Sequence, residues 1–231
     1  MKEILKAENL HKYFHDPDEF HVTNNISLAV NESEFVTLIG KSGCGKSTLL
    51  YLLATLDTDY KGRIQINGTT VTGMTQNELA RFRNEHIGFI FQFHFLLPEF
   101  TVLHNVMLPA LKLNKLDIGT IENNAVDKLD QMGMKSYALK LASKLSSGQQ
   151  QRVAIARALI NTPSIIMADE PTGNLDSVNT GIIFDIFKNL AQQGNSIIAV
   201  THDKDFAANS DRTIEMADGR IHQSINNQKP V

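Results

Sequence analysis

A glycine-rich stretch in the first quarter of the chain has the residue types of a phosphate-binding loop. Residues 40–47 read Gly-Lys-Ser-Gly-Cys-Gly-Lys-Ser and match the pattern G-x-x-x-x-G-K-[ST]. Glycines let the backbone turn tightly, so that several N–H groups and a helix N-terminus point at one anion. In such a loop the lysine reaches the β- and γ-phosphates and the hydroxyl ligates Mg²⁺. The residues predicted to bind a nucleoside triphosphate are Gly40, Lys41, Ser42, Gly43, Cys44, Gly45, Lys46, Ser47 and Thr48.

Two interpretations of Cys44 stay open. A helix N-terminus makes a thiol more reactive, which would suit a redox sensor. Alternatively, Cys44 is a small residue at a variable position of the loop.

A second stretch supplies acidic groups. Residues 165–168 form an apolar run that ends in Asp169 and Glu170. Beside a phosphate loop, a strand that delivers an aspartate places it at the Mg²⁺ next to the γ-phosphate. The adjacent Glu170 then suits a general base that polarises an attacking water. Taken alone, the two acids could instead cap the following loop.

Four further motifs follow the order found in one ATPase family. Residues 145–152, Leu-Ser-Ser-Gly-Gln-Gln-Gln-Arg, resemble the LSGGQ signature of ABC ATPases. Gln92 ends a predicted strand, as the Q-loop glutamine of that family does. Residues 173–176 resemble its D-loop, and His202 resembles its switch histidine. The resemblance covers about residues 4–225, nearly the whole chain.

The resemblance implies that ATP is held between two copies of the chain. The signature residues Ser146, Ser147, Gly148 and Gln149 open a helix, whose free N–H groups attract an anion. In ABC ATPases this segment, together with the D-loop residue Asp176, contacts the nucleotide of the other subunit. Ser147 departs from the family pattern, which has glycine at this position.

The same resemblance implies roles for three more side chains. His202 would hydrogen-bond the γ-phosphate, and Gln92 would contact the metal or the attacking water. An aromatic residue near the N-terminus stacks on adenine in this family, and the matching position is Phe14. Tyr13 is the less suitable neighbour, and a role for Phe14 in the core stays open.

Phenylalanine is concentrated around residue 92. Six of the 12 phenylalanines fall between residues 82 and 100. Two interpretations stay open: a core cluster, or the groove that receives a coupling helix of the membrane subunit in ABC ATPases. This groove would lie near residues 92–100.

Within the family, residues 88–101 and 168–176 resemble the lipoprotein-release and macrolide-export group. That implies an ATPase subunit powering a separate FtsX-like permease, with lipoprotein release from the inner membrane as the expected function. The alternatives are an ATPase that signals across the membrane, a drug or peptide exporter, and a soluble ABC ATPase of DNA repair or iron–sulfur assembly. The short span between Lys46 and Asp169 leaves no room for the long coiled coil of chromosome-maintenance proteins.

Strand and helix patterns alternate along the chain, which predicts an α/β fold with a mostly parallel sheet. Strands are predicted at residues 35–39, 63–66, 87–91, 165–168 and 196–201. Helices are predicted at residues 46–53, 76–83, 121–132, 148–159 and 178–192. The resemblance adds an antiparallel β subdomain to this phosphate-loop core. One ABC ATPase domain over 1–231 is expected, with the α/β core at 1–92 and 160–225 and a helical subdomain at about 93–159.

Composition excludes several classes of protein. The chain has 231 residues, with 22 Lys and Arg against 25 Asp and Glu, so a basic footprint for nucleic acid is missing. One cysteine excludes an internal disulfide framework and a cysteine zinc cluster. The longest apolar run, at about residues 87–97, is broken by Gln92 and His94, and the N-terminus lacks the apolar core of a signal peptide. We therefore expect a cytoplasmic protein, peripheral to the membrane through its permease.

Overall fold

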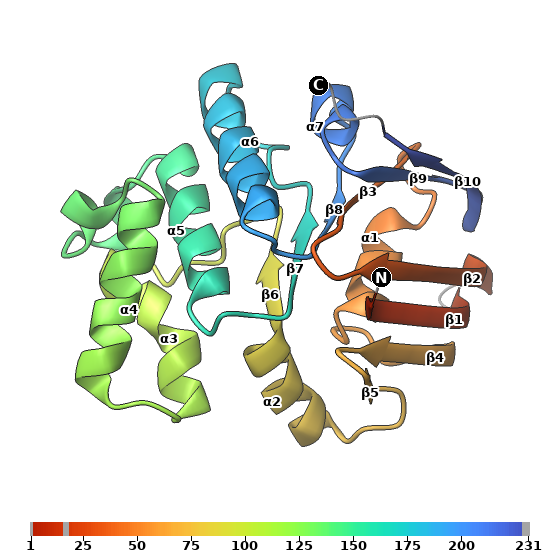
Figure 1. Ribbon diagram of the computed structural model, residues 1–231, viewed down its shortest axis with the longest axis horizontal. Helices are drawn as coiled ribbons and strands as arrows, with labels where there is room; N and C mark the ends of the chain where they lie inside the picture. Colours follow the sequence, from red (N-terminus) through yellow and green to blue (C-terminus); the bar gives the residue numbers. More distant parts are fainter. Residues whose placement is uncertain (1, 16–18, 228–231) are drawn as a thin grey trace.

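The computed structural model describes residues 2–15 and 19–227, which form two β-sheets flanked by helices (Figure 1). In spatial order, the larger sheet contains β10 (Arg220–Asn226), β9 (Arg212–Ala217), β3 (Phe35–Gly40), β8 (Ile197–Val200), β7 (Ile165–Asp169) and β6 (Ile87–Ile90). The smaller sheet contains β2 (Phe20–Asn31), β1 (Glu3–Phe14), β4 (Lys61–Ile66) and β5 (Thr69–Thr70). The helices are α1 (Lys46–Leu53), α2 (Gln76–His86), α3 (Val102–Leu113), α4 (Ile118–Gln131), α5 (Ser147–Leu159), α6 (Ser177–Gln192) and α7 (Lys204–Ala208).

The larger sheet is parallel except at one edge, which confirms the predicted α/β class. Strands β6, β7, β8, β3 and β9 pair in parallel, and β10 pairs antiparallel with β9. Along β7, Ile165 and Met167 enter one hydrophobic cluster, whereas Ile166 and Ala168 enter another. Because both faces of the strand are covered, its sequence is apolar throughout.

The smaller sheet is antiparallel, as the family resemblance implied, but its two long strands were not predicted individually. Register shifts interrupt the pairing of β1 with β2, and Asn9 and Asn25 have φ angles of 50° and 55°. Such bulges break the two-residue alternation that identifies a strand in a sequence. The strand predicted at residues 63–66 belongs to this sheet as part of β4.

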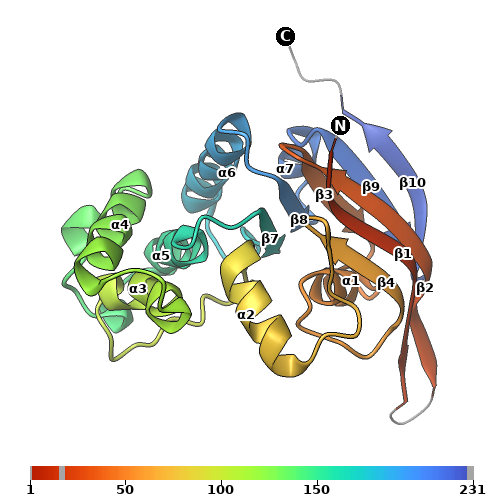
Figure 2. The ribbon, with the colours of Figure 1, turned by 60° about the horizontal axis from the view of Figure 1, so that its bottom comes forward.

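The five predicted helices correspond to α1, α2, α4, α5 and α6, with ends that differ by up to three residues. The helix α3 was expected only as part of a helical region, and it contains Pro109. Helices α3, α4 and α5 lie together on one side of the parallel sheet, whereas the antiparallel sheet lies on the other (Figure 2). Among the described residues, no helix is long and apolar enough to cross a membrane.

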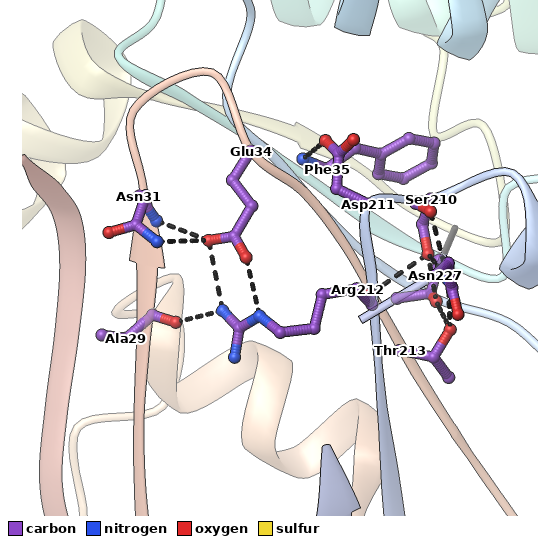
Figure 3. Close-up of polar contacts among 10 residues, drawn as sticks. Ala29, Asn31, Glu34, Phe35, Ser210, Asp211, Arg212, Thr213 and Asn227 are labelled. Atoms are coloured by element: carbon purple, nitrogen blue, oxygen red, sulfur yellow. Dashed lines mark hydrogen bonds and ion pairs between the residues drawn. The ribbon is translucent and has the colours of Figure 1, made fainter. Parts of the chain in front are cut away.

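A polar cluster ties the turn between β2 and β3 to strand β9 (Figure 3). The Arg212 guanidinium donates to Glu34 Oε1 at 2.6 Å and to the Ala29 carbonyl at 2.6 Å. The other Glu34 oxygen accepts from the Asn31 N–H at 2.7 Å. The charges are well paired and hydrogen-bonded, so this cluster holds the N-terminal end of β3 without leaving a buried charge unsatisfied.

Candidate active site

The predicted phosphate loop connects β3 to α1 and is enclosed by two neighbouring strands. Gly45 is the N-cap of α1 with φ of 95°, and a Cβ on it would lie 2.8 Å from the Val22 carbonyl oxygen. A Cβ on Gly40 would lie 2.2 Å from the Met216 carbonyl oxygen. Glycine is therefore required at both ends of the loop, because the backbones of β2 and β9 approach it too closely for a side chain.

The Lys46 side chain crosses back over this loop. Its ammonium donates to the carbonyl oxygens of Gly40 and Lys41 at 2.9 and 3.0 Å, and only 8% of the residue is exposed. A largely buried cation beside a helix N-terminus creates the positive potential that a polyphosphate requires.

The carboxylate of Asp169 lies beside the start of α1. Ser47 Oγ donates to Asp169 Oδ1 at 2.8 Å, and the Tyr51 hydroxyl donates to Asp169 Oδ2 at 2.8 Å. Burial, together with the Asp169 carboxylate, raises the pKa of Tyr51 to about 12, so this hydroxyl remains a donor at neutral pH. Asp169 is 2% exposed and its two carboxylate oxygens are both hydrogen-bonded.

Glu170 follows in a strained backbone conformation. Its φ is 48°, in the left-handed region, and its N–H donates to the Val200 carbonyl at 3.0 Å. Its carboxylate pairs with Nδ1 of His202, which follows β8. This turn directs Glu170 away from the Asp169 site, and the two neighbouring acids therefore have different partners.

Gln92 approaches the same region from β6. The sequence predicted that the strand would run through Phe91 and that Gln92 would end it, but β6 ends at Ile90. The backbone is therefore already out of the sheet at Gln92. The Gln92 carbonyl accepts from Asn174 Nδ2 at 3.4 Å, which links the segment after β6 to the segment after β7.

One cavity of about 560 Å³ collects most of the predicted site residues. It is lined by Phe14, Phe20, Val22, Gly40, Ser42, Gly43, Gly45, Lys46, Ser47, Thr48, Gln92, Glu170 and His202. Lys41 and Cys44 instead line an adjoining cavity of about 430 Å³, which shares Ser42, Gly43, Phe20 and Val22 with the first. Phe14, which is 46% exposed, is thus a cavity residue and not part of the core.

Among the residues that the structure describes, those lining this cavity do not include the signature residues. Ser146 is the N-cap of α5 and exchanges hydrogen bonds with Gln149, forming a capping box. In both views α5 lies on the opposite side of β7 and β8 from α1 (Figures 1 and 2). Ser147 and Gly148 begin the helix beyond this cap.

Asp176 and Gly148 both lie against the side chain of Asn179. Asp176 is the N-cap of α6 and accepts from the N–H and the side-chain amide of Asn179, both at 2.8 Å. A Cβ on Gly148 would lie 2.0 Å from Asn179 Oδ1. The starts of α5 and α6 therefore pack directly on each other.

The phenylalanine cluster is divided between core and surface. Phe82 is buried in a hydrophobic cluster, whereas Phe93, Phe95 and Phe100 are 61%, 63% and 42% exposed. Phe91 packs edge-on against Phe95 at a ring separation of 5.2 Å. The core interpretation therefore holds for Phe82, whereas the groove interpretation stays a prediction for the exposed Phe93, Phe95 and Phe100.

Four residues at the site were not predicted: Phe20, Val22, Tyr51 and Asn174. Tyr51 could have been found, since it lies four residues after Ser47 on the same face of the predicted helix. Phe20 and Val22 reach the cavity through the unpredicted strand β2, so no pattern in the sequence pointed to them.

The side chains beside the loop fit Mg²⁺ bound together with phosphates. Ser47 and Asp169 supply adjoining oxygen atoms, and Mg²⁺ favours one or two carboxylates plus substrate oxygens and waters. Over the described ranges, no group of three or more His, Cys, Asp or Glu could hold a metal ion unaided. The donor set therefore suits a metal that arrives with a nucleotide.

The fold and the site define a phosphate-loop nucleotide-binding protein whose parallel sheet is flanked by a separate group of helices. Residues 23–173 match the protein family described as "ABC transporter". The chain belongs to this family, as one of its ATP-binding, ATP-hydrolysing subunits.

The chain is similar to curated relatives along nearly all of its length. It is 45% identical over 221 residues to the "Lipoprotein-releasing system ATP-binding protein LolD" of Aquifex aeolicus (strain VF5), covering 96% of this chain and 97% of the relative. It is 47% identical over 219 residues to the protein of the same description from Bacteroides fragilis (strain YCH46), covering 94% and 100%.

Solved structures show the same fold. The dimeric structure of MJ0796, described as a bacterial ABC transporter cassette, superposes with a TM-score of 0.90 at 34% identity, covering 97% of this chain and 99% of that one. A post-hydrolysis dimer of MJ0796 bound to ADP and Pi gives a TM-score of 0.89, with the same identity and coverage. The α/β ATPase-cassette fold expected from the sequence is confirmed.

Proposed function

We propose that this chain is the ATPase subunit of a transporter that releases lipoproteins from the inner membrane through a separate FtsX-like permease. The observation that supports it most is the cavity in which the phosphate loop, Gln92, Glu170 and His202 meet. The similarity to LolD proteins along nearly the whole chain supplies the class of cargo.

In this proposal the cavity binds ATP in an extended arrangement. Phe14 stacks on adenine, while the loop N–H groups and Lys46 hold the phosphates. Ser47, Asp169 and Gln92 would hold Mg²⁺, which when bound neutralises negative charge on the phosphate oxygens.

In this proposal, Glu170 and His202 act together in ATP hydrolysis. The Glu170 carboxylate accepts a proton from water while the water oxygen bonds to the γ-phosphorus. The bond from the γ-phosphorus to the bridging oxygen breaks, giving ADP and phosphate. His202 holds the Glu170 carboxylate through Nδ1, and its other ring nitrogen hydrogen-bonds the γ-phosphate.

The active form in this proposal is a two-fold symmetric dimer. The residues Ser146 to Gln149 and Asp176 lie outside the cavity of their own chain, so they are available to the ATP of a second copy. The dimeric MJ0796 structures support this arrangement. ATP favours the closed dimer by bridging its halves, and hydrolysis removes that preference.

Coupling to the permease takes place at the exposed aromatic residues of the segment 92–100. The apolar face of a permease helix packs on Phe93 and Phe95, beside a cavity of about 280 Å³ that Phe95 also lines. Residues 1–231 act as one ABC ATPase domain on the cytoplasmic side of the membrane. Its α/β core comprises 1–92 and 160–225, and its helical subdomain comprises about 93–159.

A test uses Glu170→Gln, which keeps the shape of the side chain but removes its basicity. We expect this variant to bind ATP, to lose at least about 100-fold in turnover, and to elute as a dimer with ATP in size-exclusion chromatography. Lys46→Ala is the matched control, and calorimetry should detect no nucleotide binding to it. A Glu170→Gln protein that hydrolyses ATP normally and stays monomeric would refute the assigned roles.

The cargo is tested separately by purifying the chain with its permease from membranes. Lipoprotein retained on the Glu170→Gln complex supports release. Activation of a cell-wall hydrolase without bound lipoprotein would instead establish signalling across the membrane.

A further inference from the structure

The nucleotide cavity has a second aromatic side chain to which the proposed function gives no role. Phe20, at the start of β2, is 61% exposed and lines the cavity together with Phe14. The two residues are paired directly across the β1–β2 hairpin. An exposed phenylalanine pair at a cavity mouth leaves apolar area in water unless a ligand covers it.

The hairpin presents two chemically different faces. Phe20 and Val22, two residues apart on β2, both line the cavity. Between them, His21 belongs to a ring stack on Tyr13, with ring centroids 4.1 Å apart. The apolar residues of this hairpin end therefore line the nucleotide cavity, whereas His21 stacks on Tyr13 and lines only the adjoining cavity.

Close backbone contacts of Val22 and Asn24, just after Phe20 on β2, position this strand beside the phosphate loop. The Val22 carbonyl oxygen would lie 2.8 Å from a Cβ on Gly45 and 2.5 Å from a Cβ on Gly219. The Asn24 N–H also donates to the Gly219 carbonyl at 2.7 Å. These contacts hold the β2 backbone between the loop and the β9–β10 turn, so Phe20 stays beside the cavity that the loop also lines.

The rings of Phe14 and Phe20 remain available for stacking. Across residues 2–15 and 19–227, neither ring pairs with another aromatic ring. Phe14 carries the Lys12 ammonium 5.2 Å from its ring centroid, and Asp57 holds that ammonium at 2.9 Å. The Phe14 ring is thus oriented by the Lys12 ammonium, and the position of Phe20 is set by the β2 backbone.

We propose that Phe20 is a second base-binding residue, which packs on the purine base of the bound nucleotide opposite the contact made by Phe14. The proposal rests on the proposed function of the cavity as an ATP site. Base stacking on an aromatic side chain contributes affinity through the π-face of the base and needs no hydrogen bond to its edge. Phe20 therefore strengthens binding of the base and leaves binding of the triphosphate unchanged.

The experiment measures binding of ATP and of inorganic tripolyphosphate to the full chain by calorimetry. We expect Phe20→Ala to weaken ATP binding about tenfold and to leave tripolyphosphate binding unchanged. Phe20→Tyr should retain ATP affinity, whereas Phe20→Leu should lose most of it. His15→Ala changes a neighbouring side chain of the same hairpin end that does not line the cavity, and it should bind both ligands like the unaltered chain.

Each result of these binding measurements either supports or overturns the proposed role of Phe20. Unchanged ATP affinity in Phe20→Ala, with binding abolished in Lys46→Ala, would overturn the role of Phe20 alone. Normal ATP binding to Lys46→Ala would overturn the proposed function itself. If Phe20→Ala lost equal affinity for ATP and for tripolyphosphate, the substitution would have displaced the phosphate loop, and the proposed base contact would be overturned. If Phe20→Leu bound ATP as tightly as Phe20→Tyr, the residue would act by apolar contact and not by stacking.

Discussion

At the scale of single residues, Asp169 and Glu170 are adjacent in the sequence, but their carboxylates contact different partners. Asp169 accepts from Ser47 and Tyr51, so its two oxygens are oriented toward the start of α1. Glu170 turns the other way through a left-handed backbone conformation and meets His202. The two adjacent acids thus have different partners, which is consistent with the proposed metal-binding role of Asp169 and the proposed proton-accepting role of Glu170.

Tyr51→Phe tests the orientation of Asp169. Removal of the hydroxyl leaves Asp169 Oδ2 without its donor, and loss of such a supporting contact typically costs about tenfold or more in metal affinity. We expect the Mg²⁺ concentration for half-maximal ATPase activity to rise about tenfold. A parallel shift is expected in the Mg²⁺ needed to protect the ADP-bound chain from thermal unfolding.

The control for this variant is Tyr60→Phe, which removes a hydroxyl bonded to Thr72 away from the nucleotide cavity. Identical Mg²⁺ titrations for Tyr51→Phe and the unaltered chain would show that Tyr51 has no part in holding Asp169.

At the scale of elements, α5 joins the signature to the segment that follows β6. Its N-terminus carries the Ser146 cap, and its last turn carries Arg157. The Arg157 guanidinium donates to the carbonyls of His94 and Phe95, each at 2.7 Å, and Phe95 has φ of 45°. Burial lowers the pKa of this guanidinium, and the planar fork of donors suits two adjacent carbonyls.

Arg157→Ala should loosen this junction. It removes two charge-assisted hydrogen bonds and leaves backbone carbonyls unpaired, so we expect a loss of about 2 kcal/mol in the free energy of unfolding. Urea titration followed by circular dichroism measures the change. Arg81→Ala, at an exposed position of α2, should change the value by less than about 0.5 kcal/mol. Equal stability of both variants would show that the Arg157 contacts are marginal.

At the scale of the whole molecule, the two segments that are proposed to contact one ATP precede helices on opposite sides of the sheet. The phosphate loop precedes α1, and the signature precedes α5 on the opposite side of β7 and β8 (Figures 1 and 2). Contact between Gly148 and Asn179 couples the signature to the start of α6, where Asp176 also lies. These two helix starts thus pack together and form the surface that is proposed to meet a second copy.

Gly148→Ala tests that surface. The added methyl group would displace the Asn179 amide, which then loses its 2.8 Å bond to Asp176. In the Glu170→Gln background we expect at least about tenfold more ATP to be needed for dimerisation by size-exclusion chromatography, with unchanged ATP affinity of the monomer.

Gly181→Ala is the matched control, because nothing lies within 4 Å of a Cβ at that position of α6. Dimerisation of the Gly148 variant at the same ATP concentration as this control would show that the signature surface is not involved.

The motifs proposed to bind the nucleotide could be located from the sequence because each is local. The phosphate loop, the acids after β7 and the cap before α5 each occupy consecutive residues, and their patterns identify them without any long-range contact. The apolar strands of the parallel sheet were predictable for a similar reason, since burial on both faces leaves a continuous run.

The sequence by itself therefore determined the family and the α/β class, and it located the loop that is proposed to bind phosphate. Only the tertiary structure decided that Phe20 and Val22 reach the nucleotide cavity, that Tyr51 supports Asp169, and that Gly148 packs on Asn179. The physical reason is that these contacts join segments far apart in the chain or cross an irregular hairpin. Bulges in β1 and β2 remove the periodic signal, so the faces of those strands are set by packing against the loop and the β9–β10 turn.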